Sequence, residues 1–471
     1  MTKKFYLTIA IPYVNGSPHA GHALEFIQGD TIARYHKLLK EDVFFVSGSD
    51  ENGLKIVQAA EKENITPQEL ADRNTKVFQE CAKVLNVSLN EWRRGSDKKY
   101  HWPGSKKLWQ LCEKNGDIYK KRYGGFYCVG CEEFYTEKEL IEGKCPEHLT
   151  KPEWVEEENY FFKLSKYQKQ IGDLINSNKL LIIPETRRNE VLSFIKSGLQ
   201  DFSISRSKKR AKNWGIPVPN DETQIIYTWF DALNIYQTAV GFGYDESLWK
   251  KWWPADLHVI GKGIIRFHAV YWIGMLLSAG FSLPKSIFVH GYISSSGHKM
   301  SKSLGNVINP FEIVKKYGTD ATRYYLLREI PAYSDGDFSE NRFKELYNAD
   351  LANGLGNLVA RVAKLASKGV TFQGYEFNNY KIYTKALAEF RFNDALVFIW
   401  GKVTLANKAI DETQPWNLQG EKLEKFLYKI IVDILEIAFL LKPFLPQTAD
   451  KIFNQFSKAK VIIEKPLFPR L

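Results

Sequence analysis

The segment FYLTIAIPYVNGSPHAGH, residues 5–22, sets the fold class of this 471-residue chain. Its first seven residues form a continuous apolar run, which is typical of a strand buried on both faces of a sheet. A turn rich in Pro, Gly and Asn follows. Apolar residues then recur at steps of three and four through 24–38, which predicts a helix, and VFFVSG at 43–48 predicts a second strand. This order predicts an α/β fold built on a parallel sheet.

Two further strand-like runs, DLHVIGKG at 256–263 and KSIFVHGYI at 285–293, place the rest of that sheet far downstream. We therefore expect a Rossmann-type domain whose halves, residues 1–116 and 224–293, are split by an insert at 117–223. A loop-containing region follows at 294–345. Residues 346–471 show helical periodicity with few Gly or Pro and predict an all-α helix bundle.

Composition limits the class of protein. Hydrophobic residues make up 44% and aromatic residues 14% of the chain, which excludes wholesale disorder. The net charge of +11 favours a polyanion over a basic ligand, while the run RSKKRAK at 206–212 fits a solvated loop. Five cysteines are too few for a disulfide-stapled scaffold. With no leader-like start and no apolar run of about 20 residues, we expect a cytoplasmic protein that does not contact membranes.

Three cysteines and a histidine form two short pairs in the expected insert, namely Cys128 with Cys131 and Cys145 with His148. Two residues separate the members of each pair, a spacing typical of zinc knuckles. In a reducing compartment a metal site is favoured over disulfides. Since four protein ligands leave no open coordination position, we predict one structural Zn²⁺. Cys81 and Cys112 are expected to be buried apolar residues.

The turn after the first strand is suited to phosphate binding. A strand-to-helix junction presents unpaired backbone N–H groups and the positive end of the helix dipole. Gly16 and Gly21 permit close approach of the backbone to a ligand at this turn. His19 and His22 can donate hydrogen bonds to a phosphate group.

A second candidate phosphate site is GHKMSKSLGN, residues 297–306. It follows a strand-like run and precedes a helix predicted to begin near Asn309 and Pro310, with Gly318 as the C-terminal cap. Two lysines spaced by three residues among Ser and Gly form a cationic loop. Such a loop can clamp a triphosphate and stabilise the charge on a departing pyrophosphate.

Together these motifs resemble the HIGH and KMSKS signatures of class I aminoacyl-tRNA synthetases, with HAGH in place of HIGH. Several other strings are similar to those of the methionyl-tRNA synthetase family: PYVNGSPHAGH, WGIPVP, YTWFDALNIY, IGKGIIRFHAVYW, FSENRFKELYNADLANGLGN and DETQPWNL. The resemblance runs from about Phe5 to the closing LFPRL and so covers essentially the whole chain.

The resemblance implies a two-step reaction. The methionine carboxylate attacks the α-phosphorus of ATP, and the terminal ribose of tRNA then attacks the activated carbonyl. By the family pattern the transition-state donors are His19, His22, Lys299 and Lys302, and Mg²⁺ accompanies the ATP phosphates. The implied ATP-binding residues are Tyr13, Asn15, His19, Gly21, His22, Glu25, Gly261, Lys299, Ser301 and Lys302.

Methionine recognition needs an aromatic slot, because a thioether is apolar and polarizable. The resemblance assigns this slot to Ile11, Tyr13, Trp229, Tyr236, Ile264, Phe267 and His268, with Asp50 holding the ammonium group. Two positions depart from the family. Gly263 stands where an acidic residue is usual, so a ribose hydroxyl loses a partner, and Asn52 stands where a histidine is common. Glu25, next to the HAGH turn, remains a candidate for the other ribose contact. We expect adequate ATP binding despite both departures.

The resemblance also implies that the helical domain reads the anticodon of tRNA(Met), including the initiator, through Asn357, Arg361 and Trp416. It makes residues 294–345 the KMSKS loop and stem-contact region, and the stop at PLFPRL predicts a monomer. Two alternatives are another class I synthetase, such as the cysteinyl enzyme, and a non-catalytic RNA-binding relative. The cysteinyl enzyme would place zinc ligands around the amino-acid pocket, and a pure binder has no need of phosphate-clamping lysines.

Overall fold

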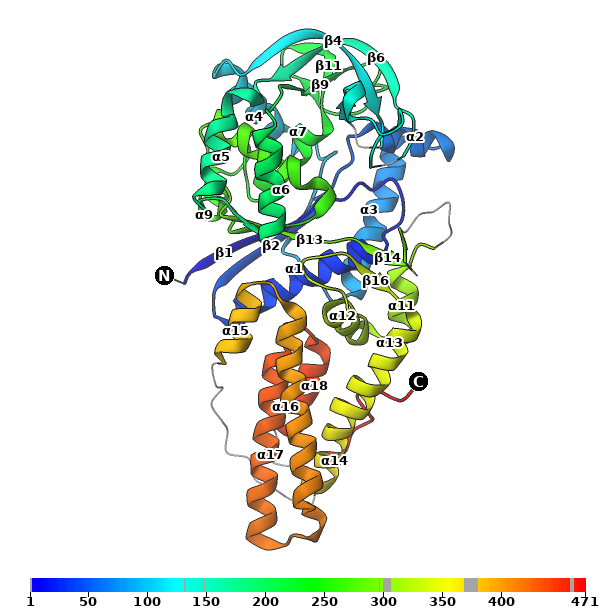
Figure 1. Cartoon of the computed structure of the whole chain (residues 1–471), viewed down its shortest axis with the longest axis vertical. Coiled ribbons are helices and arrows are strands. Elements are labelled where there is room, and N and C mark those ends of the chain that lie inside the picture. Colours follow the sequence, from blue (N-terminus) through cyan, green and yellow to red (C-terminus); the bar gives the residue numbers. More distant parts are fainter. Residues whose placement is uncertain are drawn as a thin grey trace. The chain divides into compact units, whose positions relative to one another are not determined.

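The computed structural model describes residues 2–130, 133–147, 149–295, 297–299, 306–367, 380–457 and 461–471. The chain forms two compact units (Figure 1). Unit 1 comprises Met1–Pro18, Glu41–Ala82 and Ser88–His290, and unit 2 comprises His19–Lys40, Lys83–Val87 and Gly291–Leu471. Residues 19–40 and 83–87, which lie within the range 1–116 expected for the first half of the Rossmann domain, belong to unit 2.

A six-stranded parallel sheet forms the centre of unit 1, with the strand order β3-β2-β1-β12-β13-β7. Its members are β1 (Lys4–Ile9), β2 (Asp42–Ser49), β3 (Glu91–Arg94), β7 (Leu181–Ile183), β12 (Leu257–Gly261) and β13 (Ser286–His290). In the middle of the sheet, Leu7 of β1 pairs with Phe45 on one side and with Leu257 on the other. All three side chains are buried, which confirms the predicted sheet of continuous apolar strands.

Strand β7 lies within the region expected to be the insert, yet it belongs to the main sheet, where Ile182 pairs with Ile287 of β13. Its three residues form too short an apolar run to be recognised as a strand. The other strands of this region build two antiparallel sheets. They contain β4 (Ile118–Cys128), β5 (Glu133–Tyr135), β6 (Glu153–Phe162), β8 (Phe202–Ser203), β9 (Ser205–Ser207), β10 (Pro217–Val218) and β11 (Asp221–Ile226). Strands β4 and β5 pair antiparallel, with Phe126 opposite Tyr135.

The helices of unit 1 connect these strands (Figure 1). They are α2 (Leu54–Lys62), α3 (Pro67–Val84, whose last two residues fall in unit 2), α4 (Trp102–Lys114), α5 (Gln168–Asn176), α6 (Glu185–Lys196), α7 (Thr228–Ala232), α8 (Ile235–Thr238), α9 (Glu246–Trp252) and α10 (Trp272–Ser278). Single 3₁₀ or π turns occur at Glu137–Glu139, Leu164–Tyr167, Lys262–Ile264 and Phe267–Tyr271.

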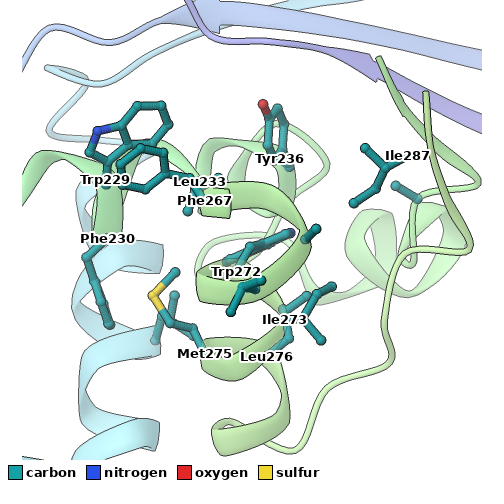
Figure 2. Close-up of a cluster of buried hydrophobic side chains, with 14 of the residues drawn as sticks. Trp229, Phe230, Leu233, Tyr236, Phe267, Trp272, Ile273, Met275, Leu276 and Ile287 are labelled. Carbon is teal, nitrogen blue, oxygen red and sulfur yellow. The ribbon is translucent and has the colours of Figure 1, made fainter. Parts of the chain in front are cut away.

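The core of unit 1 is rich in large aromatic side chains. Figure 2 shows part of it, with Trp272, Ile273, Met275 and Leu276 of α10 packed among residues of α7 and of the Phe267–Tyr271 turn. Trp272 has no exposed surface. Because such interiors are close-packed, this cluster forms a rigid support for the segments that follow the strands.

Unit 2 is mostly helical. Its elements are α1 (Ala20–Leu38), β14 (Ile293–Ser295), β15 (His298–Lys299), α11 (Pro310–Tyr317), α12 (Thr319–Arg328), β16 (Gly336–Phe338), α13 (Glu340–Leu346), a π-helical stretch Tyr347–Gly356, α14 (Asn357–Ala366), α15 (Lys381–Ala388), α16 (Phe392–Thr413), a 3₁₀ turn Pro415–Asn417, α17 (Gly420–Leu441) and α18 (Pro446–Phe456). Helices α15, α16, α17 and α18 pack in sequence order, which confirms the predicted C-terminal helices. None of the helices in the described part of the chain has the length and apolarity that a bilayer crossing requires.

The predicted ends of α11 are also confirmed. The side chain of Asn309 accepts a hydrogen bond of 2.9 Å from the Phe311 N–H, as an N-cap does. Gly318 ends the helix at φ +87°, a conformation that L side chains rarely adopt. Both caps lie where the sequence pattern placed them.

Candidate active site

The carboxyl ends of β1, β2 and β12 are neighbours in the sheet of unit 1. The segments that leave these ends carry Tyr13, Asp50 and Ile264. Ligands of open α/β sheets bind outside the carboxyl ends of the strands, where the strand order reverses. The candidate site of unit 1 therefore lies at this edge.

Asp50 is fixed in place at this edge. Its backbone N–H donates to the Pro12 carbonyl at 2.9 Å, and it forms a parallel bridge with Tyr13. Its Oδ1 accepts a 2.7 Å hydrogen bond from Thr228 Oγ1 at the start of α7. The Asp50 side chain is buried, with the residue only 2% exposed. The structure thus places a buried carboxylate next to the aromatic residues predicted to bind methionine.

Those aromatic residues form one continuous group in unit 1. The rings of Trp229 and Phe267 stack face to face, with centroids 3.9 Å apart and planes within 3°, and Figure 2 shows them overlapping. Tyr13 meets Trp229 edge to face at 6.1 Å. Ile11 and Ile264 are half-buried and pack against the same core cluster. The predicted slot is therefore assembled from the ends of two strands, α7 and the turn at Phe267.

A hydrogen-bond chain fixes the protonation of His268. Its Nδ1 lies 2.9 Å from the Ile264 carbonyl oxygen, which only accepts, so Nδ1 carries the proton. Its Nε2 then accepts from the Tyr236 hydroxyl at 2.8 Å. Burial lowers the pKa of His268 to about 4. The imidazole is neutral at physiological pH, which suits a pocket for an uncharged thioether.

The two histidines of HAGH, in unit 2, hold each other at the start of α1. The Gly21 N–H donates to His19 Nδ1 at 3.1 Å, and the His19 N–H donates to His22 Nδ1 at 3.2 Å. Because both Nδ1 atoms accept, both Nε2 atoms carry protons and are donors. A Cβ on Gly21 would lie 2.9 Å from the His19 ring, so a larger residue here would displace that ring. The pair thus presents two N–H donors at a helix N-terminus, where anions bind.

Comparison with known proteins agrees with this geometry. The family described as "tRNA synthetases class I (M)" matches residues 5–151 and 147–363. A methionine–tRNA ligase of Brucella suis is 43% identical over 96% of this chain and 91% of its own length. The corresponding Thermotoga maritima enzyme is 40% identical over 96% of this chain and 75% of its own length.

The solved structures agree as well. The Mycobacterium tuberculosis methionyl-tRNA synthetase in complex with methionyl-adenylate superposes on this chain with a TM-score of 0.92 at 38% identity. The superposition covers 100% of both chains. The chain belongs to the methionyl-tRNA synthetase family. It is therefore an aminoacyl-tRNA synthetase of the methionine–tRNA ligase type.

Not every predicted ATP-binding residue of the synthetase lies in the described part. Ser301 and Lys302 lie outside the described residues, and only the backbone of Lys299 is described, in β15. Asn15 is exposed in unit 1, as is Gly263, while Gly261 ends β12 and is half-buried. Glu25 is half-buried on α1.

The structure describes two of the four predicted zinc ligands. Cys128 and Cys145 are both buried and lie in one small cluster with Tyr135, whereas Cys131 and His148 lie outside the described residues. Neither Cys128 nor Cys145 forms a disulfide. The zinc site itself stays a prediction, since only these two of its four proposed ligands are described. Cys81 and Cys112 are buried as predicted, and burial raises the pKa of each thiol to about 12.

The predicted anticodon residues all lie in unit 2 of the synthetase. Asn357 and Arg361 share α14, where Asn357 is exposed and Arg361 forms a 2.5 Å ion pair with Asp411. Trp416 lies in the turn between α16 and α17 and is 56% exposed. A tryptophan exposed to this extent is available to stack on a base.

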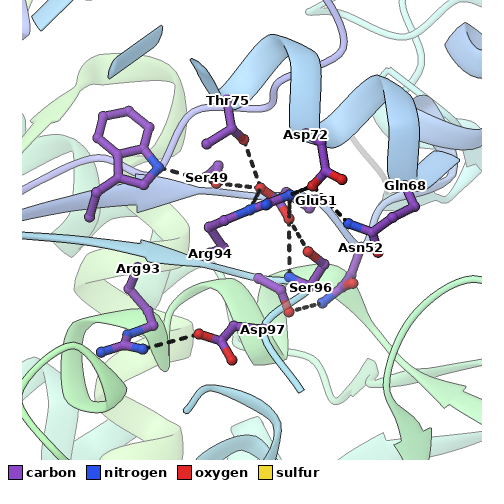
Figure 3. Close-up of polar contacts among 12 residues, drawn as sticks. Ser49, Glu51, Asn52, Gln68, Asp72, Thr75, Arg93, Arg94, Ser96 and Asp97 are labelled. Carbon is purple, nitrogen blue, oxygen red and sulfur yellow. Dashed lines mark hydrogen bonds and ion pairs between the residues drawn. The ribbon is translucent and has the colours of Figure 1, made fainter. Parts of the chain in front are cut away.

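The polar network around Glu51, next to Asp50, was not predicted from the sequence. Glu51 is fully buried and accepts hydrogen bonds from Ser49 at 2.6 Å, Thr75 at 2.7 Å and Arg94 at 2.8 Å (Figure 3). The indole N–H of Trp214 donates to the Glu51 carbonyl at 2.6 Å. Three consecutive polar residues directly after a buried strand, Asp50 to Asn52, were the available signal.

Proposed function

We propose that the chain activates methionine with ATP and transfers it to tRNA(Met) through the residues identified above. The observation that carries the proposal is a buried carboxylate beside a neutral aromatic slot. Asp50 supplies the negative charge that an ammonium group needs. The slot assigned to the methionine side chain consists of Ile11, Tyr13, Trp229, Tyr236, Ile264, Phe267 and His268. Aromatic rings contact a thioether favourably, and a neutral His268 adds no charge there.

For the first step, the chain must stabilise charge on the ATP phosphates as pyrophosphate leaves. The Nε2–H groups of His19 and His22 are donors suited to this, with Lys299 and Lys302 as cations and Mg²⁺ on the phosphates. The remaining nucleotide contacts are assigned to Tyr13, Asn15, Gly21, Glu25, Gly261 and Ser301. No side chain needs to act as a nucleophile, since the methionine carboxylate attacks the α-phosphorus directly.

The proposal extends to zinc and RNA. Cys128, Cys131, Cys145 and His148 would hold one Zn²⁺ that stabilises the fold of the insert. The helices of 346–471 would bind the anticodon through Asn357, Arg361 and Trp416, with 294–345 as the KMSKS loop and stem-contact region. We further propose that the protein acts in the cytoplasm, charges the initiator tRNA as well, and is a monomer.

Amino-acid-dependent ATP–pyrophosphate exchange, measured across a panel of amino acids, tests the proposal. We expect exchange with methionine and charging of tRNA(Met). Exchange with cysteine instead would support the cysteinyl alternative. Binding of tRNA without any exchange would support a non-catalytic relative.

A further inference from the structure

Helix α7 is tied to the segment after β2 at two points. Thr228 Oγ1 donates to Asp50 Oδ1 at 2.7 Å, and Asn52 Nδ2 donates to Asp231 Oδ2 at 2.6 Å. Thr228 and Asp231 are three residues apart and so share one face of the helix. Both hydrogen bonds are buried. Trp229, the ring that stacks on Phe267, lies on the helix between the two tied residues.

Asp231 is enclosed by polar groups that order it. The residue is 1% exposed, and its Oδ2 lies 3.5 Å from His101 Nε2. The other nitrogen of His101 lies 2.8 Å from Thr238 Oγ1. Asn52 Nδ2 also donates to the Gly95 carbonyl at 2.8 Å, so the amide joins α7 to the end of β3.

The charge state of this pair follows from its burial. Burial raises the pKa of the Asp231 carboxyl and lowers the pKa of the His101 imidazole. Both shifts favour the uncharged forms at neutral pH. Asp231 is thus a hydrogen-bonding group rather than a second negative charge beside Asp50.

This arrangement carries an energetic cost. Asp231 Oδ1 and Asn52 Oδ1 have no hydrogen-bond partner among the residues that the structure describes. A buried polar group left in that state destabilises a protein. An apolar pair of the same size would lack the hydrogen bond that joins α7 to the Asp50–Asn52 segment.

We propose that Asp231 is a positioning residue for methionine binding, which holds the Asp50–Asn52 segment against α7 through Asn52. One end of the amino acid meets Asp50 and the other meets Trp229, so the spacing of these two groups sets how well methionine fits. Asp231 touches neither end and acts through Asn52 and α7. This inference rests on the proposed methionine slot.

The test compares two substitutions of Asp231 in the full-length protein. Asp231→Ala removes the tie and is expected to raise the KM for methionine about 10- to 100-fold in ATP–pyrophosphate exchange, with the KM for ATP changed less than about twofold. Asp231→Asn keeps an acceptor for Asn52 without a charge and is expected to stay within about threefold of the wild type. Asn52→Ala removes the same hydrogen bond from the other side, together with the one to the Gly95 carbonyl, and should raise the KM for methionine at least as much as Asp231→Ala. If Asp231→Ala does not fold, Asn52→Ala carries the test.

Asp117→Ala is the matched control, because Asp117 is an equally buried carboxyl group of unit 1 that binds Lys166 and Ser278, away from α7. We expect it to lower the unfolding midpoint and leave the KM for methionine unchanged. The proposal is overturned if Asp231→Asn is as impaired as Asp231→Ala, or if Asp231→Ala and Asn52→Ala lower only stability. Asp50→Asn distinguishes a failure of this proposal from an incorrect assignment of the methionine slot. If the slot is right, Asp50→Asn raises the KM for methionine whatever Asp231→Ala does.

Discussion

The guanidinium of Arg323 and the carboxylate of Asp30 lie 2.8 Å apart in unit 2, and neither side chain has any exposed surface. Arg323, on α12, also donates to the carbonyl oxygens of Leu85, Pro443 and Phe444. One side chain therefore joins α1, the segment after α3 and the turn between α17 and α18. These contacts link α12 to three other segments of unit 2.

Removing one partner of this buried pair should be costly. We expect Asp30→Ala to lower the free energy of unfolding by about 3–5 kcal/mol, because it removes the carboxylate that is ion-paired with the buried Arg323 and with Arg34. Denaturant unfolding measures the change. Glu340→Ala, which removes an exposed partner of Lys316, is the control and should cost at most about 1 kcal/mol. Equal effects of the two substitutions would contradict this account of Arg323.

The histidines of HAGH should act through their Nε2–H donors. We expect His19→Ala and His22→Ala each to slow ATP–pyrophosphate exchange about 10²- to 10³-fold, as loss of a transition-state donor does. His22→Gln, whose amide N–H can reach the same position, should recover part of that rate. His36→Gln, at the other end of α1, serves as control and should leave the rate unchanged. No recovery in His22→Gln would argue for a role other than donation.

Acid should destabilise the protein partly through His268. Its folded-state pKa of about 4 lies below the usual value of 6.5, so between these values the unfolded chain binds a proton that the folded chain does not. Stability is therefore complete above about pH 6.5 and falls toward pH 4, by about 3 kcal/mol for this group. We compare the unfolding free energies of the wild type and His268→Gln from pH 7 to pH 4. The difference between them should become smaller by about 3 kcal/mol toward pH 4. A pH-independent difference would contradict a neutral buried His268.

Trp416 should matter for tRNA and not for adenylate formation. We expect Trp416→Ala to reduce tRNA charging about 10-fold or more, since stacking on one base contributes about 1–3 kcal/mol, while ATP–pyrophosphate exchange persists. Val397→Ala, an exposed apolar residue of α16 in the same unit, is the control for altered surface. Parallel loss of both activities would indicate a folding defect instead.

The zinc prediction has a direct measurement. Elemental analysis of protein purified without chelator should find about one zinc per chain, and Cys128→Ser or Cys145→Ser should lower that content. Cys81→Ala keeps all four proposed ligands and should retain the metal. Zinc content that is unaffected by Cys145→Ser would remove that residue from the ligand set.

Features that depend on a few neighbouring residues could be predicted from the sequence. The caps at Asn309 and Gly318 and the strands flanking HAGH follow from hydrogen bonding and periodicity within one element. The mutual capping of His19 and His22 was not foreseen, since it depends on how the turn brings the two rings to 3.9 Å. The motif alone shows only that both residues are near a helix start.

Other features depend on residues far apart in the chain. Arg323 is typical of a solvated helix face by its residue type, and only the packing of three distant segments buries it. The partnership of Asn52 with Asp231 spans 179 positions and leaves no periodic trace. The same holds for β7, whose place beside β13 is set by tertiary packing.

The alternation of the two units along the chain has a practical consequence for dissection. The chain passes from one unit to the other after residues 18, 40, 82, 87 and 290, so no single cut yields both units intact. A gene fragment starting at Gly291 would lack Asp30 and Leu85, and Arg323 would lose two of its partners. Such a fragment is expected to be poorly soluble on its own. Co-expression with the complementary piece is the more promising way to obtain the helical part.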